Sequence, residues 1–173
     1  VIEGPVHDQD LADLPVDHLQ QVLNAYRERV LDLQRDRRFR YVLIFKNHGA
    51  HAGATLEHTH TQLIATPIVP RIIQEELDGS RRYFELKERC VFCDIVQQET
   101  AEHNARRVVT TSDRFIAIEP FAPRFPFETW ILPRRHDDSF HTMSDPEEFR
   151  DLAGIVKDTL QRLNRALDRP PYN

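Results

Sequence analysis

Two strand-like runs separated by a loop of small residues constrain the fold of this chain more than any other feature. The first run, RYVLIFKN (40–47), concentrates aromatic and β-branched residues over a short length, as a strand buried on both faces does. The segment NHGAHAG (47–53) supplies a glycine break, and HTHTQLIATPIVP (58–70) then resumes strand-like composition. The pattern predicts a strand, a loop that lets a ligand approach the backbone, and a second strand.

Helical periodicity precedes these strands. Between Pro15 and about Asp36 the apolar residues recur at helical spacing, which predicts an amphipathic helix. A second helix is predicted over residues 144–167, where Ser144 and Glu147 form a capping box ahead of an apolar stripe. Helices and strands are therefore both expected.

The second half also contains predicted strands and a predicted helix, but in another order. Residues 106–120 and 126–136 read as strands that come before the helix, whereas residues 1–75 run from helix to strands. The charged stretch 76–89 is the expected connection to the second half, 90–173. Because the chain starts without methionine and stops soon after a strong helix pattern, we expect it to be an internal piece of a longer protein.

Charge and hydropathy exclude several classes of partner. A chain of 173 residues with 40% hydrophobic residues supports a packed core. A net charge of -5 and a pI near 6.0 do not provide the broad positive field that nucleic-acid binding needs. No apolar run reaches the length of a membrane helix, and the opening residues lack a signal-peptide pattern. We expect a cytoplasmic protein without a nucleic-acid or membrane partner.

The pair His58 and His60 is the strongest candidate for chemistry. In a strand, side chains alternate between faces, so these two histidines share one side with Gln62, while Thr59 and Thr61 point to the other. Neutral imidazole is a competent nucleophile toward phosphorus. An arbitrary His-x-His pair is more commonly a solvent-facing strand pair or a pair of metal ligands.

The run NHGAHAGATLEHTHTQ (47–62) resembles the active-site segment of the histidine triad superfamily. Within it, the run is most similar to the galactose-1-phosphate uridylyltransferase family, including its nucleotide-sugar phosphorylase branch. The family pattern is Asn-x-Gly-Ala, a small-residue loop, and His-x-His-x-Gln. Thr59 stands where the best-known uridylyltransferases have Pro and the phosphorylase-like members more often have Ser, so the resemblance leans toward the phosphorylases.

The resemblance implies a role for each matching residue. His60 would be the nucleophile that takes a nucleoside monophosphate from a nucleotide sugar, and Gln62 would hold a non-bridging phosphate oxygen. His58 matches a histidine that completes a zinc site in several members, whose other ligands would lie upstream. The phosphate site would be lined by Asn47, Gly49 and Gly53, with His58 beside them.

A second candidate site begins at the only two cysteines, Cys90 and Cys93. Taken alone, the Cys-x-x-Cys spacing fits half a zinc site, a redox dithiol or a coincidence, and the charged, helical stretch before it argues against a redox motif. The resemblance adds His136 as a ligand for Zn²⁺ and places the fourth ligand beyond Asn173. His141 is the local alternative for that fourth position.

The resemblance implies an α+β fold of two histidine-triad-like units, each an antiparallel sheet with a packed helix, both incomplete here. It implies ping-pong transfer of the nucleotide to a hexose 1-phosphate by a uridylyltransferase, or to inorganic phosphate by a phosphorylase. A hydrolase and a non-catalytic zinc-stabilised nucleotide-binding module are the rivals. A homodimer is expected because family members commonly dimerise. The remaining histidines are expected to be surface or loop residues: His7, His18, His48, His51 and His103.

Overall fold

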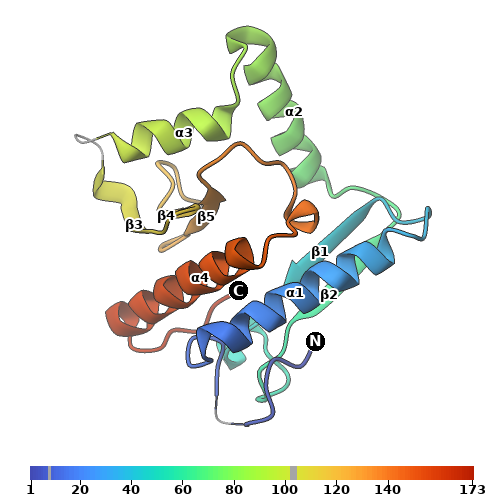
Figure 1. The fold of residues 1–173 in the computed structure, drawn as a ribbon, viewed down its shortest axis with the longest axis vertical. Helices are drawn as coiled ribbons and strands as arrows, with labels where there is room; N and C mark the ends of the chain where they lie inside the picture. Colours follow the sequence, from blue (N-terminus) through green and yellow to red (C-terminus); the bar gives the residue numbers. More distant parts are fainter. Residues whose placement is uncertain (8, 102–104) are drawn as a thin grey trace. The chain divides into compact units, whose positions relative to one another are not determined.

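The computed structural model describes residues 1–7, 9–101 and 105–173 (Figure 1), so His103 lies outside the described residues. These residues form the predicted α+β arrangement, with one two-stranded and one three-stranded antiparallel sheet. The chain divides into two compact units, Val1–Ile68 with Ser139–Asn173, and Val69–Asp138. The first unit thus combines the beginning and the end of the sequence, a division that differs from the expected halves at 1–75 and 90–173.

The first unit is built on two packed helices. Helix α1 covers Val16–Leu33, close to the predicted range, and helix α4 covers Pro146–Leu167. The two lie side by side (Figure 1) and bury their apolar stripes against each other. The buried residues of these stripes are Leu19, Val22, Leu23, Tyr26 and Val30 on α1, and Phe149, Leu152, Ala153 and Ile155 on α4.

Helix α4 begins one residue later than the capping box predicted. Its N-cap is Asp145, whose carboxylate accepts a hydrogen bond of 3.0 Å from the Glu147 N–H. The prediction of Ser144 as the cap is wrong because Pro146 suits the first helical position, which makes the residue before it the cap.

The sheet of the first unit pairs β1 (Tyr41–Phe45) with β2 (Gln62–Thr66). The prediction that the first strand is buried on both faces is wrong, because Leu43 is 40% exposed and Ile64, opposite it, is 48% exposed. These two side chains form a cross-strand pair, so the face of the sheet that they share is partly exposed. Strand β2 starts at Gln62, so both candidate histidines precede it, in an irregular stretch where His60 bridges to Ile2.

The second unit contains two helices and a three-stranded sheet. Its helices are α2 (Arg71–Lys87) and α3 (Val91–Thr100), and its strands are β3 (Val108–Thr111), β4 (Phe115–Ile118) and β5 (Trp130–Pro133). The middle strand β4 is buried along its whole length and supplies the core. The stretch 76–89, expected to be a connection, lies largely in α2, which has no buried residue among those described.

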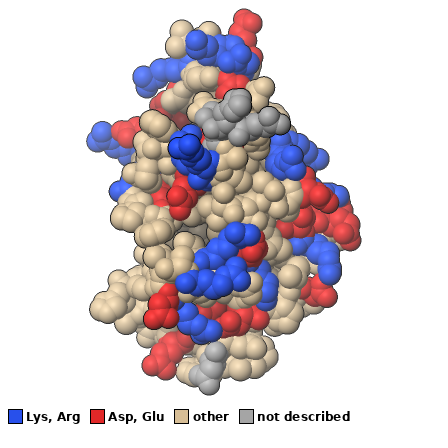
Figure 2. All heavy atoms as spheres, turned by 90° about the vertical axis from the view of Figure 1, so that its left-hand side faces the viewer, with Lys and Arg blue, Asp and Glu red and all other residues tan. Residues whose placement is uncertain are grey.

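Three short 3₁₀ turns complete the described structure: η1 (Ala50–Ala52), η2 (Ala105–Arg107) and η3 (Phe140–Thr142). Figure 2 shows acidic and basic side chains close together on one face. Exposed pairs of this kind, such as Arg162 with Asp158 at 2.9 Å, stabilise the fold by at most about 1 kcal/mol each. Across the described ranges, no helix is both long enough and apolar enough to cross a bilayer.

Candidate active site and metal centre

The glycine loop between the two strands depends on backbone conformations that favour glycine. Gly49 and Gly53 have φ values of +83° and +85°, and they flank the turn η1. Gly49 is also confined by space, because a Cβ built on it would lie 3.0 Å from Cβ of Pro171. Its carbonyl accepts hydrogen bonds of 3.1 Å from the N–H groups of Ala52 and Ala54. The loop is therefore tight, and it brings backbone to the surface of the adjoining pocket.

A pocket of about 400 Å³ lies in the first unit, and residues between Lys46 and His60 line it. Four predicted site residues share this lining: Asn47, Gly49, His58 and His60. Two others do not belong to it. Gly53 lies at the end of η1, where its carbonyl accepts a hydrogen bond of 3.5 Å from the Asn47 amide nitrogen, and Gln62 is an exposed residue at the start of β2.

The His60 ring is held by its own chain. Its Nδ1 donates to the carbonyl oxygen of His58 at 2.8 Å, and the residue is half-buried. Because a carbonyl only accepts, this bond places the proton of the neutral ring on Nδ1 and leaves the lone pair on Nε2. The ring is therefore in the tautomer that a nucleophile at Nε2 needs.

The His58 ring is held by the beginning of the chain. Its Nε2 donates to the carbonyl of Gly4 at 2.7 Å, and its centroid lies 5.6 Å from that of His7. His7 in turn contacts Glu57 at 3.3 Å. Only Nδ1 of His58 remains for a further ligand in this arrangement.

A buried polar network lies on the other face of the histidine segment, and sequence reasoning missed it. The carboxylate of Glu3 is fully buried and accepts a hydrogen bond of 2.6 Å from Nζ of Lys46 and one of 2.8 Å from the Tyr26 hydroxyl. The hydroxyls of Thr59 and Thr61 also donate to it. Both threonines are buried, which confirms the predicted alternation of faces. Nothing in the local sequence marks Glu3 as their partner.

These contacts set the ionisation of Glu3. Burial pushes the pKa of this carboxyl up, but the hydrogen bonds from Lys46, Thr59 and Thr61 and the charge of Lys46 together outweigh burial, so the pKa is lowered from its usual value of 4.5. A carboxyl with a lowered pKa in the folded state stabilises the fold fully above its unfolded pKa. That stabilisation is lost as the pH falls through the folded pKa.

The first unit should therefore lose stability in acid through Glu3. Between pH 7 and pH 5 we expect the urea midpoint to change little from this cause, and to fall as the pH drops below about 4.5, because the unfolded chain then binds the proton more readily. Glu3→Gln should lower stability at pH 7 and show a flatter dependence below pH 5. Urea titrations at a series of pH values test this; parallel curves for the parent and Glu3→Gln would contradict it.

Tyr172 and Asn173 form hydrogen bonds and a ring contact with the glycine loop and so stabilise it. His48 and Tyr172 exchange backbone hydrogen bonds of 2.8 and 3.1 Å, and their rings stack with centroids 4.7 Å apart. The side chain of Asn173 donates to Oδ1 of Asn47 and to the carbonyl of Ala52, each at 2.9 Å. His48, expected to be a surface or loop residue, lies in the loop after β1 and is half-buried between that loop and this segment.

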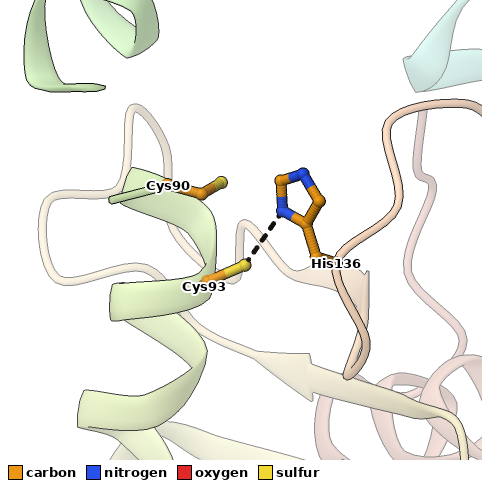
Figure 3. A group of neighbouring side chains, drawn as sticks. All are labelled: Cys90, Cys93 and His136. Carbon is orange, nitrogen blue, oxygen red and sulfur yellow. Dashed lines mark hydrogen bonds between the residues drawn. The ribbon is translucent and has the colours of Figure 1, made fainter. Parts of the chain in front are cut away.

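The second unit holds a candidate metal centre (Figure 3). Cys90 is the N-cap of α3, Cys93 lies in its first turn, and His136 follows β5. Their ligand atoms all lie within 4.8 Å of one another, and Sγ of Cys93 is 3.2 Å from Nδ1 of His136. The structure thus brings together the three residues that the sequence pointed to.

This group suits a metal ion. In a tetrahedral zinc site with bonds of about 2.0 to 2.3 Å, ligand atoms lie about 3.3 to 3.8 Å apart, so small side-chain movements would close the set. Burial and the neighbouring Cys90 thiol raise the pKa of Cys93, and a bound cation would offset that by favouring the thiolate. His141 is not part of the group; its ring lies 2.7 Å from Oγ of Ser139 in the first unit.

Two protein-family models match the chain. Residues 1–68 match the N-terminal domain of a domain of unknown function, DUF4931, and residues 76–168 match the C-terminal domain of galactose-1-phosphate uridyl transferase. The second match covers more than half of the chain. The boundary between the two matches falls near the start of α2.

Two curated relatives match the whole or nearly the whole of this chain. The chain is 36% identical over 173 residues to an ADP-glucose phosphorylase of Arabidopsis thaliana, covering 100% of this chain and 47% of that protein. It is 30% identical over 167 residues to a galactose-1-phosphate uridylyltransferase of Thermotoga maritima, covering 96% of this chain and 51% of that one. The chain therefore spans about half the length of these curated relatives.

A solved structure shares the fold. The crystal structure of an ADP-glucose phosphorylase from Arabidopsis thaliana with bound ADP-glucose superposes with a TM-score of 0.91 at 35% sequence identity, covering 98% of this chain and 53% of that one. Because the match covers 98% of this chain, the similarity extends over both units.

Proposed function

Because the chain belongs to the galactose-1-phosphate uridylyltransferase family, in the histidine-triad-like group, we propose that His60 accepts a nucleoside monophosphate from a nucleotide sugar and passes it to a phosphate-bearing acceptor. The observation that carries the proposal is the hydrogen bond of 2.8 Å from His60 Nδ1 to the His58 carbonyl, which leaves Nε2 with a lone pair beside the pocket. A solvent-facing strand histidine needs no such bond.

The first half-reaction follows from this geometry. Nε2 of His60 attacks the α-phosphorus of the nucleotide sugar, a P–N bond forms, and the bond from that phosphorus to the oxygen of the sugar 1-phosphate breaks. The ring gains positive charge as the bond forms, and the His58 carbonyl that accepts from Nδ1 stabilises it. Asn47 and Gly49 line the pocket where the phosphates would lie, and Gln62 would have to approach from the start of β2.

The second half-reaction has two candidate acceptors. Inorganic phosphate would attack the nucleotidyl-histidine and release a nucleoside diphosphate; this phosphorylase reaction is favoured by the 36% identity to an ADP-glucose phosphorylase. A hexose 1-phosphate would release a new nucleotide sugar instead; this reaction is favoured by the 30% identity to a galactose-1-phosphate uridylyltransferase. Both acceptors meet the same covalent intermediate, and we expect the protein to work as a homodimer.

The metal would have a structural role in this scheme. Cys90, Cys93 and His136 would hold Zn²⁺, which would tie α3 to the end of β5. Two thiolates leave the ion little Lewis acidity, so the transfer chemistry rests on His60.

Intact-mass spectrometry tests the proposal. The zinc-loaded protein is incubated with UDP-glucose or with ADP-glucose, and a uridylyl or adenylyl adduct that maps to His60 is expected from one of them. The isolated adduct is then mixed with inorganic phosphate or with galactose 1-phosphate, and the acceptor that discharges it identifies the reaction. If the folded, zinc-loaded protein forms no adduct with either nucleotide sugar, the covalent mechanism is wrong and a binding module is the better description. Discharge by water alone at the same rate would identify a hydrolase.

A further inference from the structure

The ion pair of Glu3 and Lys46 lies directly behind the two histidines. The segment Val1–Gly4 runs beside residues 58–61, with a hydrogen bond of 3.2 Å from the Glu3 N–H to the Thr59 carbonyl and a bridge from Ile2 to His60. This pairing points Glu3 at the face opposite the histidine rings. Lys46 comes to the same place from the end of β1.

The ammonium group of Lys46 makes three hydrogen bonds. Its Nζ donates to Oε2 of Glu3 at 2.6 Å, to Oγ1 of Thr59 at 2.9 Å and to the carbonyl oxygen of His60 at 3.0 Å. Its side chain is 10% exposed and that of Glu3 is 0% exposed. An ammonium has three N–H groups, so these acceptors use all of them.

A buried ion pair of this kind contributes little net free energy to the stability of the fold. Removing two charges from water carries a desolvation cost that apolar residues of similar volume avoid. An apolar residue at position 46, however, offers no donor to the His60 carbonyl. The distinctive contribution of Lys46 is therefore the position of that carbonyl.

Two backbone carbonyl groups flank Thr59 in the histidine segment. The His58 carbonyl accepts from Nδ1 of His60, and the His60 carbonyl accepts from Lys46. One residue, Thr59, separates them, and its hydroxyl is bound to the same Glu3–Lys46 pair. A shift of this backbone would move the His58 carbonyl away from the His60 ring.

We propose that Lys46, anchored on Glu3, is a positioning residue that holds His60 in one tautomer with Nε2 facing the pocket. Lys46 acts through the backbone of residues 58–60 and contacts no reacting atom. The effect on rate rests on the proposed nucleophilic role of His60, whereas the effect on the tautomer does not. The other reading of Lys46, a direct phosphate ligand, would need an N–H that its present partners occupy.

The two readings separate in kinetics. Loss of a positioning residue lowers kcat and the rate of adduct formation with little change in KM, whereas loss of a phosphate ligand raises KM. Misplacement of a reacting group by about 1 Å costs up to about 100-fold in rate. The structure therefore predicts a change confined to kcat.

The test uses the variant Glu3→Gln/Lys46→Met. Lys46→Met alone would leave a buried carboxylate without its cation and fold poorly, so the double variant removes both charges and keeps an amide for Thr59, Thr61 and Tyr26. Lys157→Met is the matched control, because Nζ of Lys157 donates to the carbonyls of Leu14 and Asp13 in the same unit, away from the pocket. Circular dichroism verifies that both variants are folded.

Two measurements are made on the parent and both variants. We expect adduct formation in the double variant to slow by about 10- to 100-fold with KM within about threefold of the parent. We expect long-range ¹H–¹⁵N spectra to show one His60 tautomer in the parent and in Lys157→Met, and a mixture in the double variant. Spectra of His60→Gln assign the signals.

A double variant with the parent's rate and a single tautomer would overturn the proposal, and so would a raised KM with unchanged kcat. If the parent itself forms no adduct, the proposed function fails, and the tautomer measurement alone still decides whether Lys46 positions the ring.

Discussion

His60→Asn is expected to abolish nucleotidyl transfer while the protein stays folded and still binds its nucleotide sugar. Asparagine fills similar space, but its amide nitrogen has no available lone pair, so no P–N bond can form. Removal of a catalytic nucleophile costs about 10⁴-fold or more in kcat. The rest of the pocket lining remains, so the affinity for the nucleotide sugar should change by less than about tenfold.

The measurement combines steady-state turnover, intact mass after incubation with the nucleotide sugar, and calorimetric titration of the same sample. His141→Asn is the matched control, since this histidine lies beside Ser139, outside the pocket. It should form the adduct at the parent's rate. If His60→Asn kept turnover, the nucleophile assignment would be wrong; if the parent bound the nucleotide sugar but neither turned it over nor formed an adduct, the non-catalytic binding module would replace the enzyme.

Removal of the metal is expected to produce the largest loss of stability. Apparent zinc-binding free energies of structural sites reach about 10 to 16 kcal/mol, and that energy contributes to folding when the site forms only in the folded chain. The second unit has its own buried strand, β4, so we expect partial rather than complete loss of structure without metal. A destabilisation of at least about 3 kcal/mol is the predicted outcome for Cys93→Ser or for treatment with a chelator.

The experiment pairs metal analysis with hydrogen exchange. The parent should carry one zinc per chain, and His136→Asn should lose most of it, whereas His141→Asn should keep it because His141 is not part of the ligand group. Amide protection should fall within Val69–Asp138 and persist in α1 and α4, which belong to the other unit. Zinc-free protein with unchanged protection in the second unit would show that the cysteines hold no structural ion.

Local patterns in the sequence were enough to predict helices α1 and α4 and the alternation of faces at residues 58–62. The apolar spacing from Val16 onward gave α1 to within a few residues, because a single amphipathic stripe packs against a single neighbour. The alternation at residues 58–62 correctly separated the histidines from the buried threonines. The stretch 76–89, expected to be a connection, lies largely in the charged helix α2, which has no buried residue in the described structure.

Long-range contacts explain what the sequence did not reveal. Glu3 meets Thr59 and Thr61 across more than fifty residues of chain, and nothing near Glu3 indicates that partner. Tyr172 reaches the glycine loop from the other end of the sequence. Helical and strand periods describe neighbours in the chain, so they cannot report which distant segments meet.

The contact of Tyr172 with the glycine loop also affects the order in which the two units can fold during synthesis. The first unit needs residues 139–173 before α4 can cover α1 and before Tyr172 can pair with His48, whereas residues 69–138 form one continuous stretch. On the ribosome the second unit can thus mature while the first waits with its α1 stripe uncovered. During that interval the uncovered apolar stripe of α1 exposes the nascent chain to aggregation.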